Sequence, residues 1–465
     1  MTEEMQKTQD CLRRDRTESE EYAGVQTVIG ISHDSLVEVN LSSEMLLETI
    51  LSRGNMNAAY KRVMSNKGSC GVDNMGLDEL LPYLKRHGEE LTTSILKGRY
   101  KPNPVRRVEI PKDNDKTRQL GIPTLVDRVI QQSLSQVLSS IYESKFSGSS
   151  YGFRPNRSAH DALLRSKELV NQGYTYCVDL DLEKFFDTVN HSFLLRLLSF
   201  TIKDGRVISL IHKYLKAGVM VNGIVQESNV GTPQGGPLSP LLSNIVLNEL
   251  DKELEKRGHP FVRYADDCII FCKTPRAAER VKDSITNFIE KKLHLIVNRE
   301  KTMACSVRDI KFLGHSFYAA HGGTWRLRIH GKSLLKFKSK LKELTMRSNG
   351  MGYAKRKEVL TNAIRGWVSY FRYADAKGNL QAIDEWLRRR IRMCIWKSWK
   401  NPKTRIRNLM RCGIEKWRAC KCGYSDKGYW AVAGSGIMQV AVSNRNLARA
   451  GYPTLLGYYE RYHRM

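Results

Sequence analysis

Two adjacent carboxylates between short β-forming runs constrain this chain more than any other feature. Asp266 and Asp267 lie between the runs 261–263 and 268–271, which are rich in strand-forming residues. The pattern predicts a β-hairpin with the Asp pair at its tip. Two ionised carboxylates about 4 Å apart repel each other by roughly 4 kcal/mol at an effective dielectric constant near 20. Such a pair is typical of a cation site, and oxygen ligands suit Mg²⁺; the alternative is a solvated turn.

A third carboxylate is predicted on a neighbouring strand. Residues 174–182 alternate with period 2, so the apolar residues fall on one face and Asp179 and Asp181 on the other. One of these, with the hairpin pair, would make a three-carboxylate site able to hold two divalent ions, which two-metal enzymes place about 3.5–4 Å apart. The alternation leaves open whether Asp179 or Asp181 is the ligand.

Several motifs now resemble a known family. Residues 178–187 read VDLDLEKFFD, residues 231–240 read GTPQGGPLSP, and residues 264–267 read YADD. These resemble the palm motifs of reverse transcriptases, in the wording of bacterial group II intron-encoded proteins, most of all the compact class C members. Five further matching blocks stand in the expected order, at 108–113, 118–123, 151–155, 298–302 and 312–315. The resemblance covers residues 45 to 400, and the ordered set is far more specific than any one motif.

The resemblance implies an α+β fold of the right-hand polymerase type. Fingers and a palm with an antiparallel sheet would be followed by an α-helical thumb, called domain X in maturases, and by a small basic C-terminal segment. The implied divisions are an acidic, disordered extension at 1–43, an N-terminal helical extension of the fingers at 44–99, fingers and palm at 100–330, thumb or domain X at 331–400 and a DNA-binding segment at 401–465.

The family pattern resolves the ambiguous strand carboxylate. The family's metal ligand is followed five positions later by an aromatic residue and six later by Asp, which Asp181 meets and Asp179 does not. The resemblance therefore implies Asp181, Asp266 and Asp267 as catalytic ligands of two Mg²⁺ ions, for which Mn²⁺ could substitute. Phe186 matches the residue under the sugar of the incoming nucleotide, where a rigid ring excludes a ribose 2′-hydroxyl. Read alone, Phe186 would be an ordinary core residue.

Four more residues match positions that handle the nucleotide. Lys112 and Arg118 lie in a polar stretch where cations would neutralise triphosphate oxygens. Gln234 lies in a Gly- and Pro-rich loop that would touch the nucleotide. Lys301 matches a catalytic lysine placed to protonate the departing pyrophosphate. Taken singly, each of the four is more typical of a solvated charge or a turn.

The charge of the chain predicts a polyanionic partner. There are 76 Lys and Arg against 48 Asp and Glu, a formal charge of +28. Residues 332–465 alone hold 30 basic and 8 acidic side chains, which favours nucleic acid over a membrane surface. No apolar run reaches the ~18–20 residues of a membrane span, and ten cysteines without framework spacing indicate a reducing compartment. We expect a bacterial cytoplasmic protein without a membrane partner.

The basic residues of the expected thumb are predicted to contact RNA. Apolar residues at helical spacing predict three helices, near 334–344, 360–371 and 383–395. Cations interleaved with Trp suit contact with phosphates and stacking on bases, whereas the alternative is a solvated helix face. The expected RNA-binding residues are Lys336, Lys338, Lys340, Arg388, Arg389, Arg390, Arg392, Lys397 and Lys400.

The C-terminal residues 401–465 continue the basic surface. Residues 431–442 are apolar and β-prone, and the position alone matches the DNA-binding segment of the family. Cys412, Cys420 and Cys422 have a spacing that fits no standard zinc site. Paired cysteines with metal-binding histidines are absent from the sequence, so we expect no HNH endonuclease domain.

The resulting interpretation is a group II intron-encoded reverse transcriptase and maturase. Its expected partners are the intron RNA, an RNA template with a DNA primer, deoxynucleoside triphosphates and target DNA. One alternative is a reverse transcriptase of the retron or diversity-generating type. Another is a splicing-only RNA-binding maturase, although the catalytic carboxylates, which such decay should erode first, are all present.

Overall fold

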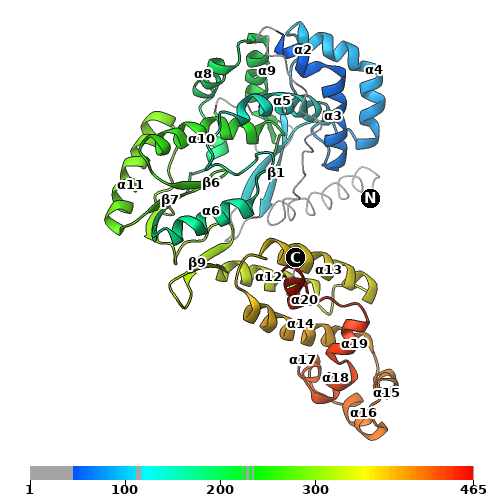
Figure 1. Cartoon of the computed structure of the whole chain (residues 1–465). Helices are drawn as coiled ribbons and strands as arrows, with labels where there is room; N and C mark the ends of the chain where they lie inside the picture. Colours follow the sequence, from blue (N-terminus) through cyan, green and yellow to red (C-terminus); the bar gives the residue numbers. More distant parts are fainter. Residues whose placement is uncertain (1–44, 112–116, 222–223, 227–229, 233–234, 464–465) are drawn as a thin grey trace. The chain divides into compact units, whose positions relative to one another are not determined.

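The computed structural model describes residues 45–463, apart from 112–116, 222–223, 227–229 and 233–234. The chain divides into two compact units, residues 1–310 and 311–465 (Figure 1). The expected disordered extension at 1–43 lies outside the described residues, as do Lys112 and Gln234. No helix in the described ranges is long and apolar enough to cross a bilayer.

The first unit begins with helices that pack beside a small sheet. The helices are α2 (Leu46–Leu51), α3 (Arg53–Ser65), α4 (Leu77–Leu96) and α5 (Leu125–Glu143). The sheet has the order β2-β1-β4-β5, with β1 (Val105–Pro111), β2 (Thr117–Ile122), β4 (Val219–Val221) and β5 (Ile224–Gln226). Helix α5 is capped at its start by Thr124, whose side chain accepts from the Asp127 amide, and it buries an apolar stripe.

A second sheet of this unit is antiparallel and has the order β6-β7-β3-β8. Its strands are β3 (Tyr176–Leu180), β6 (Phe261–Tyr264), β7 (Asp267–Cys272) and β8 (Met303–Ser306). The helices around it are α6 (Ala159–Asn171), α7 (Phe185–Thr188), α8 (His191–Thr201), α9 (Gly205–Lys216), α10 (Ser239–Lys256), α11 (Pro275–Phe288) and the π-helical turn η2 (Ile289–Leu293). The antiparallel sheet that the resemblance implies is thus present.

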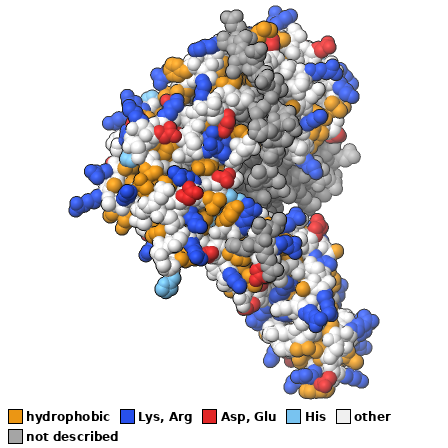
Figure 2. All heavy atoms as spheres, viewed as in Figure 1, with side chains coloured by type: hydrophobic (Ala, Val, Ile, Leu, Met, Phe, Trp, Pro, Cys, Tyr) orange, Lys and Arg blue, Asp and Glu red, His pale blue; other side chains and the backbone are white. Residues whose placement is uncertain are grey.

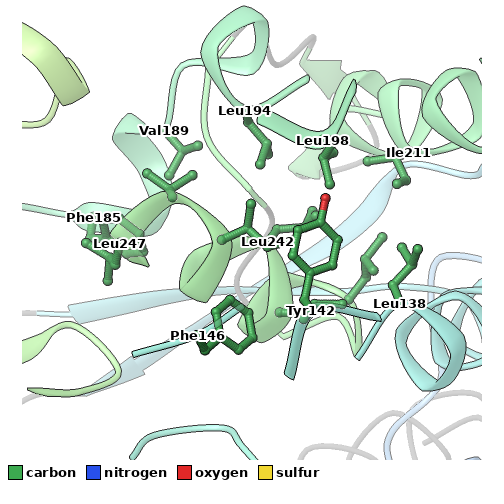
Figure 3. Close-up of a cluster of buried hydrophobic side chains, with 14 of the residues drawn as sticks. Leu138, Tyr142, Phe146, Phe185, Val189, Leu194, Leu198, Ile211, Leu242 and Leu247 are labelled. Carbon is green, nitrogen blue, oxygen red and sulfur yellow. The ribbon is translucent and has the colours of Figure 1, made fainter. Parts of the chain in front are cut away.

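One large apolar core joins the helices to the antiparallel sheet. Figure 3 shows side chains of α5, α7, α8, α9 and α10 gathered in one cluster, among them Tyr142, Phe185, Leu198 and Leu242. Val178 and Leu180 of β3 belong to the same core. Burial of apolar surface stabilises a fold by about 25 cal/mol per Å². Because β3 takes part in this core, the core holds the strand, and with it the strand end, in place.

The second unit starts with a β-hairpin and continues as helices. The strands are β9 (His315–Ala319) and β10 (Trp325–Ile329), and the first helices are α12 (Gly331–Leu344), α13 (Tyr353–Tyr370) and α14 (Lys377–Ser398). The three expected helices are therefore present. Phe337 of α12 stacks on Trp367 of α13 with ring centroids 4.2 Å apart. The hairpin 315–329 belongs to this compact unit, whereas the sequence placed it with the fingers and palm.

Short helices joined by turns make up the described part of the C-terminal residues. The helices are α15 (Pro402–Arg411), α16 (Lys416–Gly423), α17 (Tyr429–Ala433), α18 (Gly436–Ala441), α19 (Asn444–Arg449) and α20 (Leu455–His463). The β-prone interpretation of residues 431–442 was wrong. Gly434 is the C-cap of α17, and Ser435 caps α18 by accepting from the Met438 amide. The apolar residues there are buried at helical rather than alternating positions.

Candidate active site

The Asp266–Asp267 pair lies at a two-residue turn between β6 and β7. Tyr264 pairs with Asp267 across the hairpin, so Ala265 and Asp266 form the loop. Ala265 has φ of +57°, a left-handed conformation that costs an L-residue roughly 1–2 kcal/mol. The hairpin predicted from sequence is confirmed, and both Asp side chains are exposed.

A buried hydrogen-bonded scaffold holds this turn in place. Arg263 is fully buried and forms a two-pronged ion pair with Asp251 of α10, with Nε to Oδ1 at 2.7 Å and Nη2 to Oδ2 at 2.5 Å. Its Nη1 atom donates to the carbonyl of Ala265 and to Oδ1 of Asn244, both at 2.9 Å. Asn244 in turn donates to the carbonyl of Gly152. The turn therefore rests on α10 and on the segment around Gly152.

Asp181 follows β3 directly and is anchored by the segment 298–302. The Asp181 carbonyl accepts from the Asn298 amide at 2.9 Å, and the Asp181 amide donates to Thr302 Oγ1 at 3.1 Å. Lys301 Nζ lies 3.1 Å from Asp181 Oδ2. The Asp181 and Lys301 side chains are 36% and 58% exposed, so both are accessible from solvent.

The strand register brings the three carboxylates to one end of the sheet. Leu180 of β3 pairs with Cys268 of β7, so Asp181 comes next to the strand end where Asp267 begins β7. In the described part of the chain, no group of three or more His, Cys, Asp or Glu side chains is close enough to hold a metal ion as the side chains stand. The candidate donors are carboxylate oxygens that are exposed or partly exposed, and oxygen ligands fit a hard divalent cation.

Asp179 differs from Asp181 in its surroundings. Asp179 is half-buried within β3, and burial, followed by repulsion from Asp181, raises its pKa to about 6. Its neighbour on the same face, Cys177, is fully buried beside Cys305 of β8. The carboxylate-bearing face is therefore open only at its end, where Asp181 lies, and not along the whole strand.

Two aromatic neighbours in α7 have different environments. Phe185 is buried in the core, whereas Phe186 is half-buried beside it with ring centroids 5.3 Å apart. The Thr232 amide donates to the Phe186 carbonyl at 2.6 Å, and Gly231 with φ of +93° lies against the α7 backbone. The described start of the Gly- and Pro-rich loop is thus fixed to the helix that carries Phe186.

Part of the expected nucleotide site is not described. Lys112 and Gln234 fall in the gaps, and of Arg118 only the backbone is described, in β2 opposite Ile110. The residue after Gln234, Gly235, has φ of +125° and lies against the Gly121 carbonyl of β2. The described flanks of this loop therefore run from α7 to the end of β2.

The expected RNA-binding residues fall into two groups. Lys336, Lys338, Lys397 and Lys400 are exposed, and Lys340, Arg389 and Arg390 are partly exposed. Arg388 and Arg392 are 4% and 7% exposed and donate to the backbone carbonyls of Pro453 and Val442. The prediction of one solvent-facing arginine ridge was wrong for these two, because they point inward and hold the C-terminal residues.

Sequence reasoning missed the residues beneath the site. Asp251, Asn244, Arg263 and Gly152 were not singled out, although they position the Asp266 turn through direct hydrogen bonds. A signal was present for two of them. Polar residues at 244 and 251 interrupt an otherwise apolar helical face, and buried polar side chains require partners.

An antiparallel sheet with three carboxylates at one end, a lysine beside them and an anchored Gly-rich loop defines the palm of a nucleotide-polymerising enzyme. The model of the family described as reverse transcriptase (RNA-dependent DNA polymerase) matches residues 110–317. The model described as the group II intron maturase-specific domain matches residues 334–413.

Individual relatives agree with these family matches. Protein YkfC of Escherichia coli (strain K12) is 34% identical over 317 residues, which are 59% of this chain and 83% of that protein. Group II intron-encoded protein LtrA of Lactococcus lactis subsp. cremoris is 32% identical over 335 residues, 57% of this chain and 55% of LtrA. The match therefore spans about half the length of LtrA.

Among solved structures, a chain of the partial Cas6-RT-Cas1--Cas2 complex is 25% identical, with a TM-score of 0.36, and the match covers 53% of this chain and 43% of that one. The chain belongs to the group II intron reverse transcriptases, in which an RNA-directed DNA polymerase domain is followed by a maturase domain. Members of this family act on nucleic acids and depend on divalent metal ions.

Proposed function

We propose that Asp181, Asp266 and Asp267 hold two Mg²⁺ ions and that this site copies RNA into DNA. The observation that carries the proposal is the β3–β7 register, which brings two exposed carboxylates and one partly exposed carboxylate to one strand end within the reverse transcriptase match. When bound, such ions activate the attacking primer oxygen and steady the departing pyrophosphate. Mn²⁺ could replace Mg²⁺ with the same oxygen ligands.

The chain's own residues would orient the substrate around this centre. Phe186, half-buried on α7, would lie under the sugar and favour deoxynucleotides, and Gln234 would contact the nucleotide. Lys112 and Arg118 would neutralise the triphosphate. Lys301 Nζ lies 3.1 Å from Asp181 Oδ2, and Lys301 would donate a proton to the pyrophosphate as it leaves.

We propose a division of labour along the chain that agrees with the two units except at the hairpin 315–329, which belongs to the second unit. We assign residues 44–99 to a helical extension of the fingers, and 100–330 to fingers and palm. Residues 331–400 would form the thumb or maturase domain X. The excess of basic residues after 332 supports binding of a long polyanion there.

At the level of the whole protein, we infer that the chain binds the RNA of the group II intron that encodes it and promotes its splicing. It would then copy that RNA into DNA at a target site, inside a bacterial cytoplasm. The maturase-specific match and the basic second unit support the RNA role.

A paired assay separates the two activities. Purified protein is added to a transcript of its flanking intron with both exons, and splicing is followed beside primer extension on an unrelated RNA template. We expect Asp266→Asn to abolish extension and to leave splicing intact, because the turn lies far in sequence from the maturase domain. Splicing that never responds to the wild-type protein would contradict the maturase role.

A further inference from the structure

Three cations of the second unit surround one aromatic ring. Arg347 Cζ, Lys397 Nζ and Arg405 Cζ lie 4.8, 5.3 and 6.0 Å from the centroid of the Tyr429 ring. The cations come from three separate elements, namely the loop after α12, the last turn of α14 and the first turn of α15. We call these four residues the Tyr429 cluster.

The cluster is built on a firm base. Tyr429 is half-buried and packs on Met393, Cys394 and Ala433 at the contact between α14 and α17. Arg405 also lies 4.8 Å from the Trp396 ring and donates from Nε to the Trp399 carbonyl. Arg405 is therefore held in place, whereas Arg347 and Lys397 are exposed above the same ring.

The cations of the cluster lack a counter-charge within the described residues. None of the three forms an ion pair with a carboxylate there. Salt screens the repulsion between charges only when they are farther apart than the Debye length of about 8–10 Å, so the cations repel one another. A cation–π contact contributes about 0.5–1 kcal/mol at an exposed site. One tyrosine ring shared by three cations offsets little of that repulsion, so the site favours an external anion.

We propose that the Tyr429 cluster binds the phosphodiester backbone of the intron RNA; this inference rests on the proposed maturase function and names a contact for it. All three cations lie within residues 334–413, the maturase-specific match. The ring of Tyr429 is already covered by cations, so the cluster recognises phosphates and does not stack on a base.

The contacts of Arg405 and Tyr429 give residues 401–465 a part in RNA binding in this proposal. Arg405 and Tyr429 come from the segment that the sequence assigned to DNA binding. Asp384 of α14 accepts from the Leu455 and Leu456 amides at the start of α20, which packs on α13 and α14. The C-terminal helices therefore complete the body that carries α12 to α14, and they supply part of its RNA site. Figure 2 shows Lys and Arg side chains at several places on the visible face of this unit.

The test compares two charge-matched double variants of the full chain. Arg347→Gln with Lys397→Gln removes two exposed cations of the cluster. Lys377→Gln with Arg461→Gln removes two exposed cations outside the cluster. Lys377 begins α14, about 30 Å along that helix from Lys397, and Arg461 lies in α20. Binding to a transcript of the flanking intron, to an unrelated structured RNA and to duplex DNA of the insertion site is measured across a salt series, with thermal melting as the folding check.

We expect the cluster variant to bind the intron RNA about tenfold more weakly than the wild type. The slope of its log affinity against log salt concentration should be shallower by about 1.4 to 1.8, because two phosphate contacts are lost. The control should match the wild type. Equal losses of affinity in both variants, or a loss confined to DNA binding, would overturn the proposal. If the double variant melts at a lower temperature than the wild type, the single variant Arg347→Gln, in an exposed loop, repeats the test. A wild-type protein without preference for the intron RNA would instead contradict the proposed function.

Discussion

The backbone of Gly152 lies directly against the amide of Ala265, such that a Cβ atom built on Gly152 would come within 2.2 Å of the Ala265 nitrogen. Ala265 is the first residue of the turn that presents Asp266. Backbone cannot yield as a flexible side chain can, so any larger residue at 152 must move the turn.

We therefore expect Gly152→Ala to lower the rate of primer extension by about a hundredfold, since displacements near 1 Å at a reacting centre have effects of that size. Gly148→Ala is the matched control, because no atom lies within 4 Å of a Cβ there. Single-nucleotide incorporation rates give the comparison. Unchanged incorporation by Gly152→Ala would show that the turn does not depend on this contact.

The buried Asp251–Arg263 ion pair beneath the β6–β7 turn should make a large contribution to the free energy of unfolding. Both side chains have no exposed surface, so Asp251→Asn leaves a buried guanidinium without its counter-charge and should cost about 3–5 kcal/mol in the free energy of unfolding. Glu253→Gln on the same helix, which breaks a partly exposed pair with Arg257, should cost about 0–1 kcal/mol. Chemical denaturation of both variants measures the difference, and equal effects would contradict the account.

Lys301 is expected to act in the chemical step. Replacing it by Met removes the cation that lies beside Asp181 and should slow nucleotide transfer by about 10²- to 10⁴-fold, while Lys301→Arg should retain part of the rate. Arg299→Gln is the control, since it removes an exposed cation two residues away that pairs with Glu290. Pre-steady-state incorporation at saturating nucleotide distinguishes a slower step from weaker binding. A full rate in Lys301→Met would exclude the proposed role.

Asp204 should contribute a pH-dependent part of the stability. Burial acts to raise its pKa, but hydrogen bonds from the Arg206 side chain and from the Leu47 and Arg206 amides outweigh this and hold the pKa below 3.8. A lowered carboxylate pKa stabilises the fold above pH 3.8, and this contribution is lost as the pH falls through the folded-state value.

Asp204→Asn should accordingly be less stable than the wild type by about 1–3 kcal/mol at pH 7, with the gap closing toward pH 3. Asp283→Asn, at an exposed position of α11, should track the wild type at every pH. Denaturant titrations between pH 3 and pH 7 follow both variants. A gap that stays constant over this range would assign the effect to packing and not to charge.

The hairpin of Asp266 and the strand that leads to Asp181 could be predicted because the sequence patterns behind them are local. The β-forming runs on either side of Asp266 and the alternation through Asp179 and Asp181 follow from short-range periodicity, and the β6–β7 hairpin agrees. The choice of Asp181 over Asp179 and the role expected of Phe186 came instead from the family resemblance. The carboxylates needed no knowledge of distant contacts. The ordered motifs then supplied the family.

The parts that were missed depend on contacts between distant segments. Arg388 and Arg392 have the same local pattern as solvated arginines, and only the return of the C-terminal helices makes them interior residues. The residues 431–442 are apolar enough for a strand, but Gly434 and Ser435 divide them into two capped helices. The pairing of Gly152 with Ala265 likewise joins segments more than a hundred residues apart.

The most direct test of the central claim is primer extension on an RNA template with deoxynucleotides, comparing the wild type with Asp266→Ala in Mg²⁺ and after chelation. The account predicts extension by the wild type, its loss on chelation, its return when Mg²⁺ is restored, and a loss of about a thousandfold or more in Asp266→Ala. Asp283→Ala controls for the removal of one carboxylate. Extension that persists at the wild-type rate in Asp266→Ala, or that ignores chelation, would contradict the three-carboxylate metal site.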